Sequence, residues 1–141
     1  MKPHKFQVSD CTELKLAQCI FEVWPDMNEQ IQNHNFATLS RQVHSLRCYG
    51  SAALNLAFVA AGYADIYCHI GCHIWDYAAG AIIVKEAGGI VVDPKGKTLD
   101  LMNREILVAS KSELVQDWLQ KVDFKHENYE RDHKESLIFV D

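Results

Sequence analysis

Apolar and polar positions along the chain follow two alternating patterns. Short apolar runs, which are typical of buried strands, cover residues 5–8, 14–23, 46–49, 64–69, 90–93 and 106–109. Apolar residues spaced three and four apart, which are typical of helices, cover residues 28–44, 50–61, 76–87 and 112–121. Strands that alternate with helices in this way predict a layered α/β fold, an α-β sandwich.

The helix predicted to begin at Asp76 is apolar on two opposite faces. One face carries Ala79, Ile82, Ile83 and Ala87, and the other carries Tyr77, Ala81 and Val84. Such a helix is predicted to be packed on both sides, and the 50–61 helix shares this property. Asp76 is the predicted N-cap, because its carboxylate can accept hydrogen bonds from the first free amides.

The remaining helices and the end of the chain have a different character. The 28–44 helix is amphipathic and is predicted to lie on the surface, and Ser112 is the predicted N-cap of the last helix. Residues 1–121 are predicted to form one α/β unit. Residues 122–141 are predicted to be a charged tail, because the stretch HENYERDHKES is rich in charge and is expected to be solvated.

Composition narrows the class of protein. The chain has 141 residues, of which 48% are hydrophobic and 23% charged, and this suits one domain with a core. A net charge of −5 argues against nucleic acid or a membrane surface as a partner. We expect no signal peptide, and the longest mostly apolar run, 52–61, is too short for a membrane helix. Five cysteines without disulfide-framework spacing predict a reducing, cytoplasmic location.

Three stretches carry residue types that can do chemistry. Asp76 at a helix start is most often a structural cap, although a carboxylate there can also bind a hard cation. Gly50 and Ser51 suit a turn and a cap, and they also present amides at a helix N-terminus, where anionic or hydroxyl-rich ligands bind. The stretch Cys68–His73 holds two thiols and two imidazoles, but no second ligand pair with zinc spacing follows it, and C-x-x-C-H is absent.

The stretch GCHIWDYAAG, residues 71–80, with IVKEAGG at residues 83–89, resembles the C-terminal signature of the inositol monophosphatase family. The resemblance extends from about Lys5 to about Lys121 and covers only the second half of that family's chain. It implies the C-terminal half of the family's layered α/β fold. It also implies a Mg²⁺-dependent phosphoric monoester hydrolase of inositol phosphate metabolism and phosphatidylinositol signalling, which converts inositol monophosphate, or a similar small polyol phosphate, to the polyol and phosphate.

The resemblance also implies roles for individual residues, none of them a catalytic acid or base. Asp76 matches the aspartate that binds a catalytic Mg²⁺, and hard Mg²⁺ prefers carboxylate oxygen. Gly50, Ser51 and Ala52 match a segment that touches the inositol ring. His69 stands where members with the inositol preference usually carry a glutamate that accepts hydrogen bonds from a sugar hydroxyl, which puts the substrate preference in question. Residues 24–26, Trp-Pro-Asp, stand where the family has a Gly/Ser-rich segment that makes another contact with the ring.

The family's other motifs do not occur in this chain. The sequence has neither Asp-Pro-(Ile/Leu)-Asp-Gly-Thr nor the Glu-Glu pair that together supply the remaining metal carboxylates. A lone carboxylate holds Mg²⁺ poorly, so the chain alone is expected to be a weak phosphatase or none. It would then be a fragment, a shortened gene product or a half that relies on a homodimer or partner chain. The alternatives are a non-catalytic dimer partner or regulatory half, and a sister phosphatase for a bisphosphorylated nucleotide or sugar.

Overall fold

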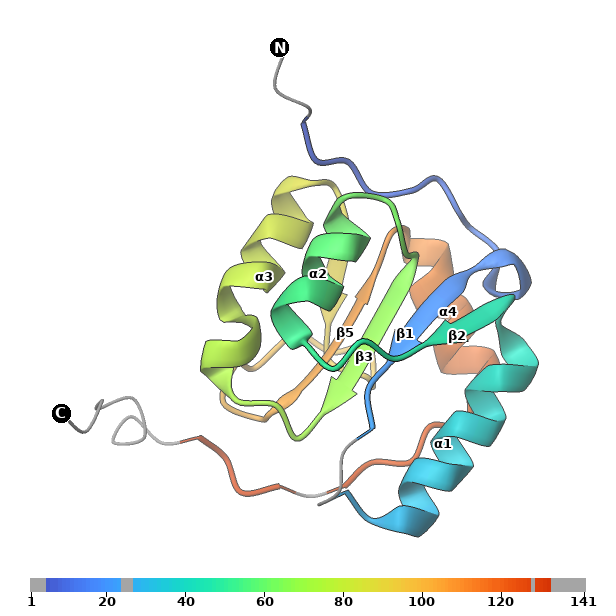
Figure 1. Cartoon of the computed structure of the whole chain (residues 1–141), viewed down its shortest axis with the longest axis vertical. Helices are drawn as coiled ribbons and strands as arrows, with labels where there is room; N and C mark the ends of the chain where they lie inside the picture. Colours follow the sequence, from blue (N-terminus) through green and yellow to red (C-terminus); the bar gives the residue numbers. More distant parts are fainter. Residues whose placement is uncertain (1–4, 24–26, 128, 133–141) are drawn as a thin grey trace, which may run out of the picture.

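A mixed β-sheet forms the middle layer of the computed structural model, which describes residues 5–23, 27–127 and 129–132 (Figure 1). Within these residues the strand order is β2-β1-β3-β5-β4. The strands are β1 (Gln18–Phe21), β2 (Ser45–Arg47), β3 (Ile66–Ile70), β4 (Ile90–Val92) and β5 (Glu105–Ala109). β1 is parallel to both β2 and β3, whereas β5 is antiparallel to β3 and β4.

Helices cover both faces of the sheet, so the expected layered α/β architecture is confirmed (Figure 1). The helices are α1 (Glu29–Gln42), α2 (Ala52–Ala60), α3 (Ile74–Glu86) and α4 (Ser112–Lys121). Side chains alternate along β3: Cys68 packs with residues of α1 and α4, while Tyr67 packs with residues of α2 and α3. Every residue of β3 is buried, as a central strand requires. No helix in the described ranges is long and apolar enough to cross a membrane.

Helices α2 and α3 lie side by side on one face of the sheet (Figure 1). They approach closely at Gly80, where an added Cβ would lie 2.4 Å from Cδ1 of Leu56. The prediction that both helices are buried on all sides is wrong within the described chain. Their inner faces are buried, but four large apolar side chains on their outer faces are exposed, namely Leu54, Trp75, Ile82 and Ile83. The apolar pattern was correct, and nothing in the described chain covers the second face.

Several predicted boundaries also differ from the structure. Residues 5–8 form no strand, although the Val8 N–H donates to the Ala87 carbonyl at 3.2 Å. The run 14–23 begins as the short 3₁₀ helix η1 (Leu14–Leu16), and only Gln18–Phe21 pairs in the sheet. The N-cap of α3 is His73 instead of Asp76, and that of α4 is Lys111 instead of Ser112. Helix α3 begins at Ile74, two residues before Asp76, and helix α4 begins at Ser112 itself, so each expected cap lies inside its helix.

The described part of the C-terminal segment packs against the rest of the molecule. Val122 and Phe124 are buried, and the Phe124 ring meets the Phe21 ring at a centroid distance of 5.9 Å. Asp132 is 6% exposed, so the expectation that the charged stretch is solvated is wrong at this residue. The division of the chain at residue 121 stays a prediction.

Candidate active site

The five residues to which the family resemblance assigns a substrate or metal role, Gly50, Ser51, Ala52, His69 and Asp76, all line one hollow. It measures about 390 Å³ and lies where the end of β3 faces the N-terminal ends of α2 and α3. Its lining residues are Gly50, Ser51, Ala52, Ala53, His69, Trp75 and Asp76. Another hollow, of about 420 Å³, is lined by Lys5, Phe6, Gln7, Ala61 and Tyr63 and carries no carboxylate. The hollow at Asp76, which we call the Asp76 hollow, is therefore the better candidate for chemistry.

A tight turn forms one wall of the Asp76 hollow. Gly50 has φ = +75°, which favours glycine, and Ser51 caps α2 by accepting a hydrogen bond from the Leu54 N–H at 3.3 Å. The first turn of a helix has free amides and a partial positive charge, both of which attract anions. This wall can therefore bind a phosphate or hydroxyl group.

A buried carboxylate that was not predicted from the sequence accepts hydrogen bonds from the backbone of this turn. Glu22, directly after β1, is 3% exposed and accepts hydrogen bonds from Tyr49 N–H at 3.0 Å, Gly50 N–H at 3.0 Å and Asn55 Nδ2 at 2.6 Å. Burial alone would raise the pKa of Glu22, but the hydrogen bonds from Tyr49, Cys48, Asn55 and Gly50 lower it below its ordinary value. Glu22 is therefore ionised at neutral pH. Its partners lie far away in the sequence, so local spacing gave no signal.

His69 forms the floor of the Asp76 hollow and is 8% exposed. Its Nδ1 shares a hydrogen bond with the Tyr67 hydroxyl. Burial lowers the pKa of His69 to about 4, although the charges of Glu22 and Asp76 act in the opposite direction. The imidazole is therefore neutral at pH 7, whereas a glutamate at this position would bring a negative charge next to Asp76.

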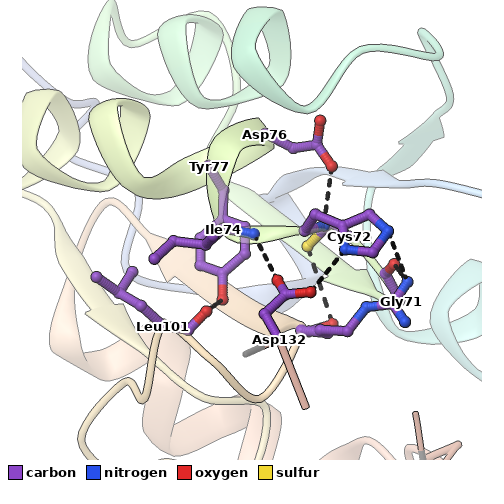
Figure 2. Close-up of polar contacts among 9 residues, drawn as sticks. Gly71, Cys72, Ile74, Asp76, Tyr77, Leu101 and Asp132 are labelled. Carbon is purple, nitrogen blue, oxygen red and sulfur yellow. Dashed lines mark hydrogen bonds and ion pairs between the residues drawn. The ribbon is translucent and has the colours of Figure 1, made fainter. Parts of the chain in front are cut away.

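Asp76 projects from the first turn of α3, at its third residue (Figure 2). Its Oδ2 accepts a hydrogen bond from the His73 N–H at 2.8 Å, so it secures the start of the helix without being the N-cap. Its other oxygen receives no hydrogen bond from the described residues and is available to a ligand. Trp75, which precedes it, is 53% exposed at the edge of the hollow.

The described residues do not form a complete Mg²⁺ site. Among them there is no group of three or more His, Cys, Asp or Glu side chains that could hold a metal ion. Mg²⁺ combines carboxylates with waters and substrate phosphate in a nearly ideal octahedron, and Asp76 offers only one carboxylate. Asp76 could thus offer one ligand to such an ion, and the described residues supply no group of three that would complete its coordination. Residues 24–26, which stand where the family has a further ring-contact segment, lie outside the described residues.

The comparisons with known proteins agree on one family. Residues 1–127 match the model of the inositol monophosphatase family. Inositol monophosphatase 2 of Rattus norvegicus is 36% identical in an alignment of 135 positions, which covers 91% of this chain and 45% of that protein. The chain thus spans less than half the length of this curated relative.

Two solved structures share the fold over a similar portion. The extragenic suppressor protein suhB from Bartonella henselae has 25% identity and a TM-score of 0.79, over 86% of this chain and 48% of that one. The inositol monophosphatase from Anabaena has 32% identity and a TM-score of 0.75, over 83% of this chain and 49% of that one. The similarity therefore extends over most of this chain and about half of each of these structures.

Proposed function

The chain belongs to the inositol monophosphatase family, and we propose that it takes part in the Mg²⁺-dependent hydrolysis of a small polyol phosphate such as inositol monophosphate. In this proposal Gly50, Ser51, Ala52 and His69 form the wall that holds the polyol, and Asp76 supplies one carboxylate to the metal. The observation that carries the proposal is the convergence of these five residues on one hollow of about 390 Å³. A small phosphorylated polyol fits a space of this size.

The charges around the Asp76 hollow support a phosphate ester as the ligand. The N-terminal ends of α2 and α3 face it, and such ends stabilise negative charge. Neutral His69 adds no negative charge that would repel phosphate. Bound Mg²⁺ would supply the positive charge that neutralises the phosphoryl oxygens and activates water.

The remaining metal ligands would come from a second copy or a partner chain. The exposed apolar side chains of α2 and α3 support this part of the proposal, because Trp75 belongs both to that face and to the Asp76 hollow. A polypeptide that covers this face would also approach Asp76. All five cysteines are free thiols, which supports a reducing compartment such as the cytoplasm.

Phosphate release from inositol 1-phosphate tests the proposed activity. The purified chain is assayed with and without Mg²⁺ at several protein concentrations, beside Asp76→Asn and the control Glu86→Gln, an exposed carboxylate at the far end of α3. We expect weak Mg²⁺-dependent release that is lost in Asp76→Asn and kept in Glu86→Gln. If copies complete one another's sites, the rate per chain rises with concentration. A bisphosphorylated nucleotide in a parallel assay tests the sister-phosphatase alternative. Release that is equal in Asp76→Asn would refute the role of Asp76.

The second candidate function is that of a non-catalytic dimer partner or regulatory half. The incomplete metal ligand set and the exposed face of α2 and α3 favour it. It predicts association without turnover, which sedimentation of wild type and Ile82→Glu would reveal. Leu119→Glu is the matched control, because Leu119 is a similarly exposed apolar residue on α4, across the sheet. Wild type that sediments as a monomer and releases no phosphate would count against both candidates.

A further inference from the structure

The C-terminal segment contributes a carboxylate to the first turn of α3. Asp132 Oδ2 accepts a hydrogen bond from the Ile74 N–H at 2.9 Å, and Oδ1 lies 2.7 Å from His73 Nδ1 (Figure 2). Asp132 is 59 residues from His73 in sequence and is 6% exposed. Its own N–H donates to the Met102 carbonyl at 2.9 Å, so its backbone is fixed as well. Asp132 thus acts as a helix cap supplied from the far end of the chain.

This carboxylate also determines the state of the His73 ring. Nη2 of Arg104 lies 3.2 Å from His73 Nε2 and also donates to the Gly71 carbonyl at 2.6 Å. A guanidinium can only donate, so Nε2 must be the acceptor. The ring hydrogen is therefore on Nδ1 and is donated to Asp132. Opposite partners on its two nitrogens hold the imidazole in one plane and one tautomer.

The fixed ring packs against a side chain that lines the Asp76 hollow. The His73 and Trp75 rings are stacked with centroids 4.4 Å apart and an interplanar angle of 12°. The backbone N–H of His73 donates to Asp76 Oδ2. One residue, His73, therefore links Asp132 both to the aromatic wall of the hollow and to the carboxylate within it.

Further contacts attach the same segment to the loop before β5. Arg131 Nη2 lies 2.7 Å from Asp100 Oδ2, and the Arg104 guanidinium lies 5.0 Å from the centre of the Tyr129 ring. Several independent contacts therefore hold residues 129–132 beside the start of α3, and Asp132 is the member that reaches the helix.

We propose that Asp132 is a positioning residue for the Asp76 hollow: it holds His73 in the Nδ1–H form and thereby fixes Trp75 and the backbone donor to Asp76. The importance of this positioning for a substrate rests on the proposed function. The positioning itself is a property of the folded chain and is measurable without turnover.

Nuclear magnetic resonance of Asp132→Asn and Asp132→Ala tests the proposal. The matched control is Asp93→Asn, because Asp93 is also buried and accepts backbone N–H hydrogen bonds from Lys95 and Lys97, in a turn after β4. In Asp132→Asn one carboxylate oxygen becomes an NH₂ group that cannot accept, so we expect either faster exchange of the Ile74 amide or a change in the His73 ring-nitrogen shifts. In Asp132→Ala, which removes the cap, we expect the Ile74 amide to exchange about fivefold faster. In Asp132→Ala, we expect the two ring-nitrogen shifts of His73 to approach each other, as tautomers mix, and the Trp75 indole signal to move.

The control separates positioning from general stability. The proposal requires that Asp93→Asn leave the Ile74, His73 and Trp75 signals in place. It would be overturned if these signals were unchanged in both folded Asp132 variants, or if Asp93→Asn moved them equally. If Asp132→Ala does not fold, Asp132→Asn decides the matter alone through Ile74 exchange and the His73 shifts. Absence of phosphate release in wild type would count against the proposed function, while these signals would still decide the role of Asp132.

Discussion

Replacing Glu22 tests whether the buried carboxylate supports the turn that lines the Asp76 hollow. Glu22 Oε1 accepts hydrogen bonds from Tyr49 N–H, Gly50 N–H and Asn55 Nδ2, and Oε2 accepts from Cys48 Sγ. In Glu22→Gln the side chain keeps its shape, but one oxygen becomes an NH₂ group that cannot accept. The charge that strengthened the other hydrogen bonds is also lost.

The size of the effect follows from the kind of hydrogen bond. A hydrogen bond to a charged group contributes about 1.5–3 kcal/mol, against about 0.5–1.5 kcal/mol for a neutral one. In Glu22→Gln, three hydrogen bonds change from the charged to the neutral kind and each contributes less. Burying a neutral amide costs less than burying a carboxylate, and this offsets part of the loss. We expect the free energy of unfolding to fall by about 2 kcal/mol. Glu22→Ala should cost about 3 kcal/mol or more, because it leaves the Tyr49, Gly50 and Asn55 donors without an acceptor.

Urea unfolding at pH 7 measures these differences. The urea midpoint should fall while the slope stays constant, which marks a change in stability without a change in the surface exposed. Glu86→Gln should lie within about 0.5 kcal/mol of wild type, because Glu86 is exposed. The lowered pKa of Glu22 means that its contribution is present above the unfolded value of about 4.3 and is lost as the pH falls through the folded value. A Glu22→Gln protein as stable as Glu86→Gln at pH 7 would refute the reasoning.

Three further predictions concern the stability of the folded chain. The pKa of His69, about 4 in the folded chain, lies below its unfolded value of about 6.5, so the unfolded state binds more protons between these values. Stability should therefore fall by about 3 kcal/mol from pH 7 to pH 4 in urea titrations, and His69→Gln, unlike exposed His44→Gln, should flatten this slope. Gly80→Ala should lower stability by about 1–2 kcal/mol because its Cβ meets Leu56, and the cost should shrink in a Leu56→Ala background. Phe124→Ala should cost about 3 kcal/mol in thermal or urea unfolding if the C-terminal segment packs as described, and a surface-like change below 0.5 kcal/mol would contradict that packing.

The local pattern of apolar and polar residues predicted most elements of the fold. Helical spacing located α1, α2, α3 and α4, because an apolar stripe is needed wherever a helix meets a sheet. The same pattern overestimated burial at Ile82 and Ile83, since periodicity shows which face is apolar and not which element covers it. It also made Asp76 the N-cap, because an aspartate in the first turn stabilises a helix start at the third position as well as at the cap.

The hydrogen bonds that Glu22 and Asp132 make to the residues around the hollow could not be predicted from local pattern. The residues of the hollow were recognised from one continuous stretch around Asp76 and a second around Ser51. Glu22 and Asp132 act on these stretches from 28 and 59 residues away, so no spacing links them to Gly50 or His73. Such long-range hydrogen bonds exist only once the sheet has brought the strand ends together.

Mapping of inositol 1-phosphate onto the chain by amide chemical shifts, with Mg²⁺ present, tests the central claim most directly. The account predicts that shifts concentrate on Gly50, Ser51, Ala52 and the first turn of α3, that they saturate, and that Asp76→Asn weakens the binding. This result does not depend on turnover. Shifts that gather elsewhere, or no shifts in a folded chain at millimolar ligand, would contradict the claim that the Asp76 hollow is the substrate site.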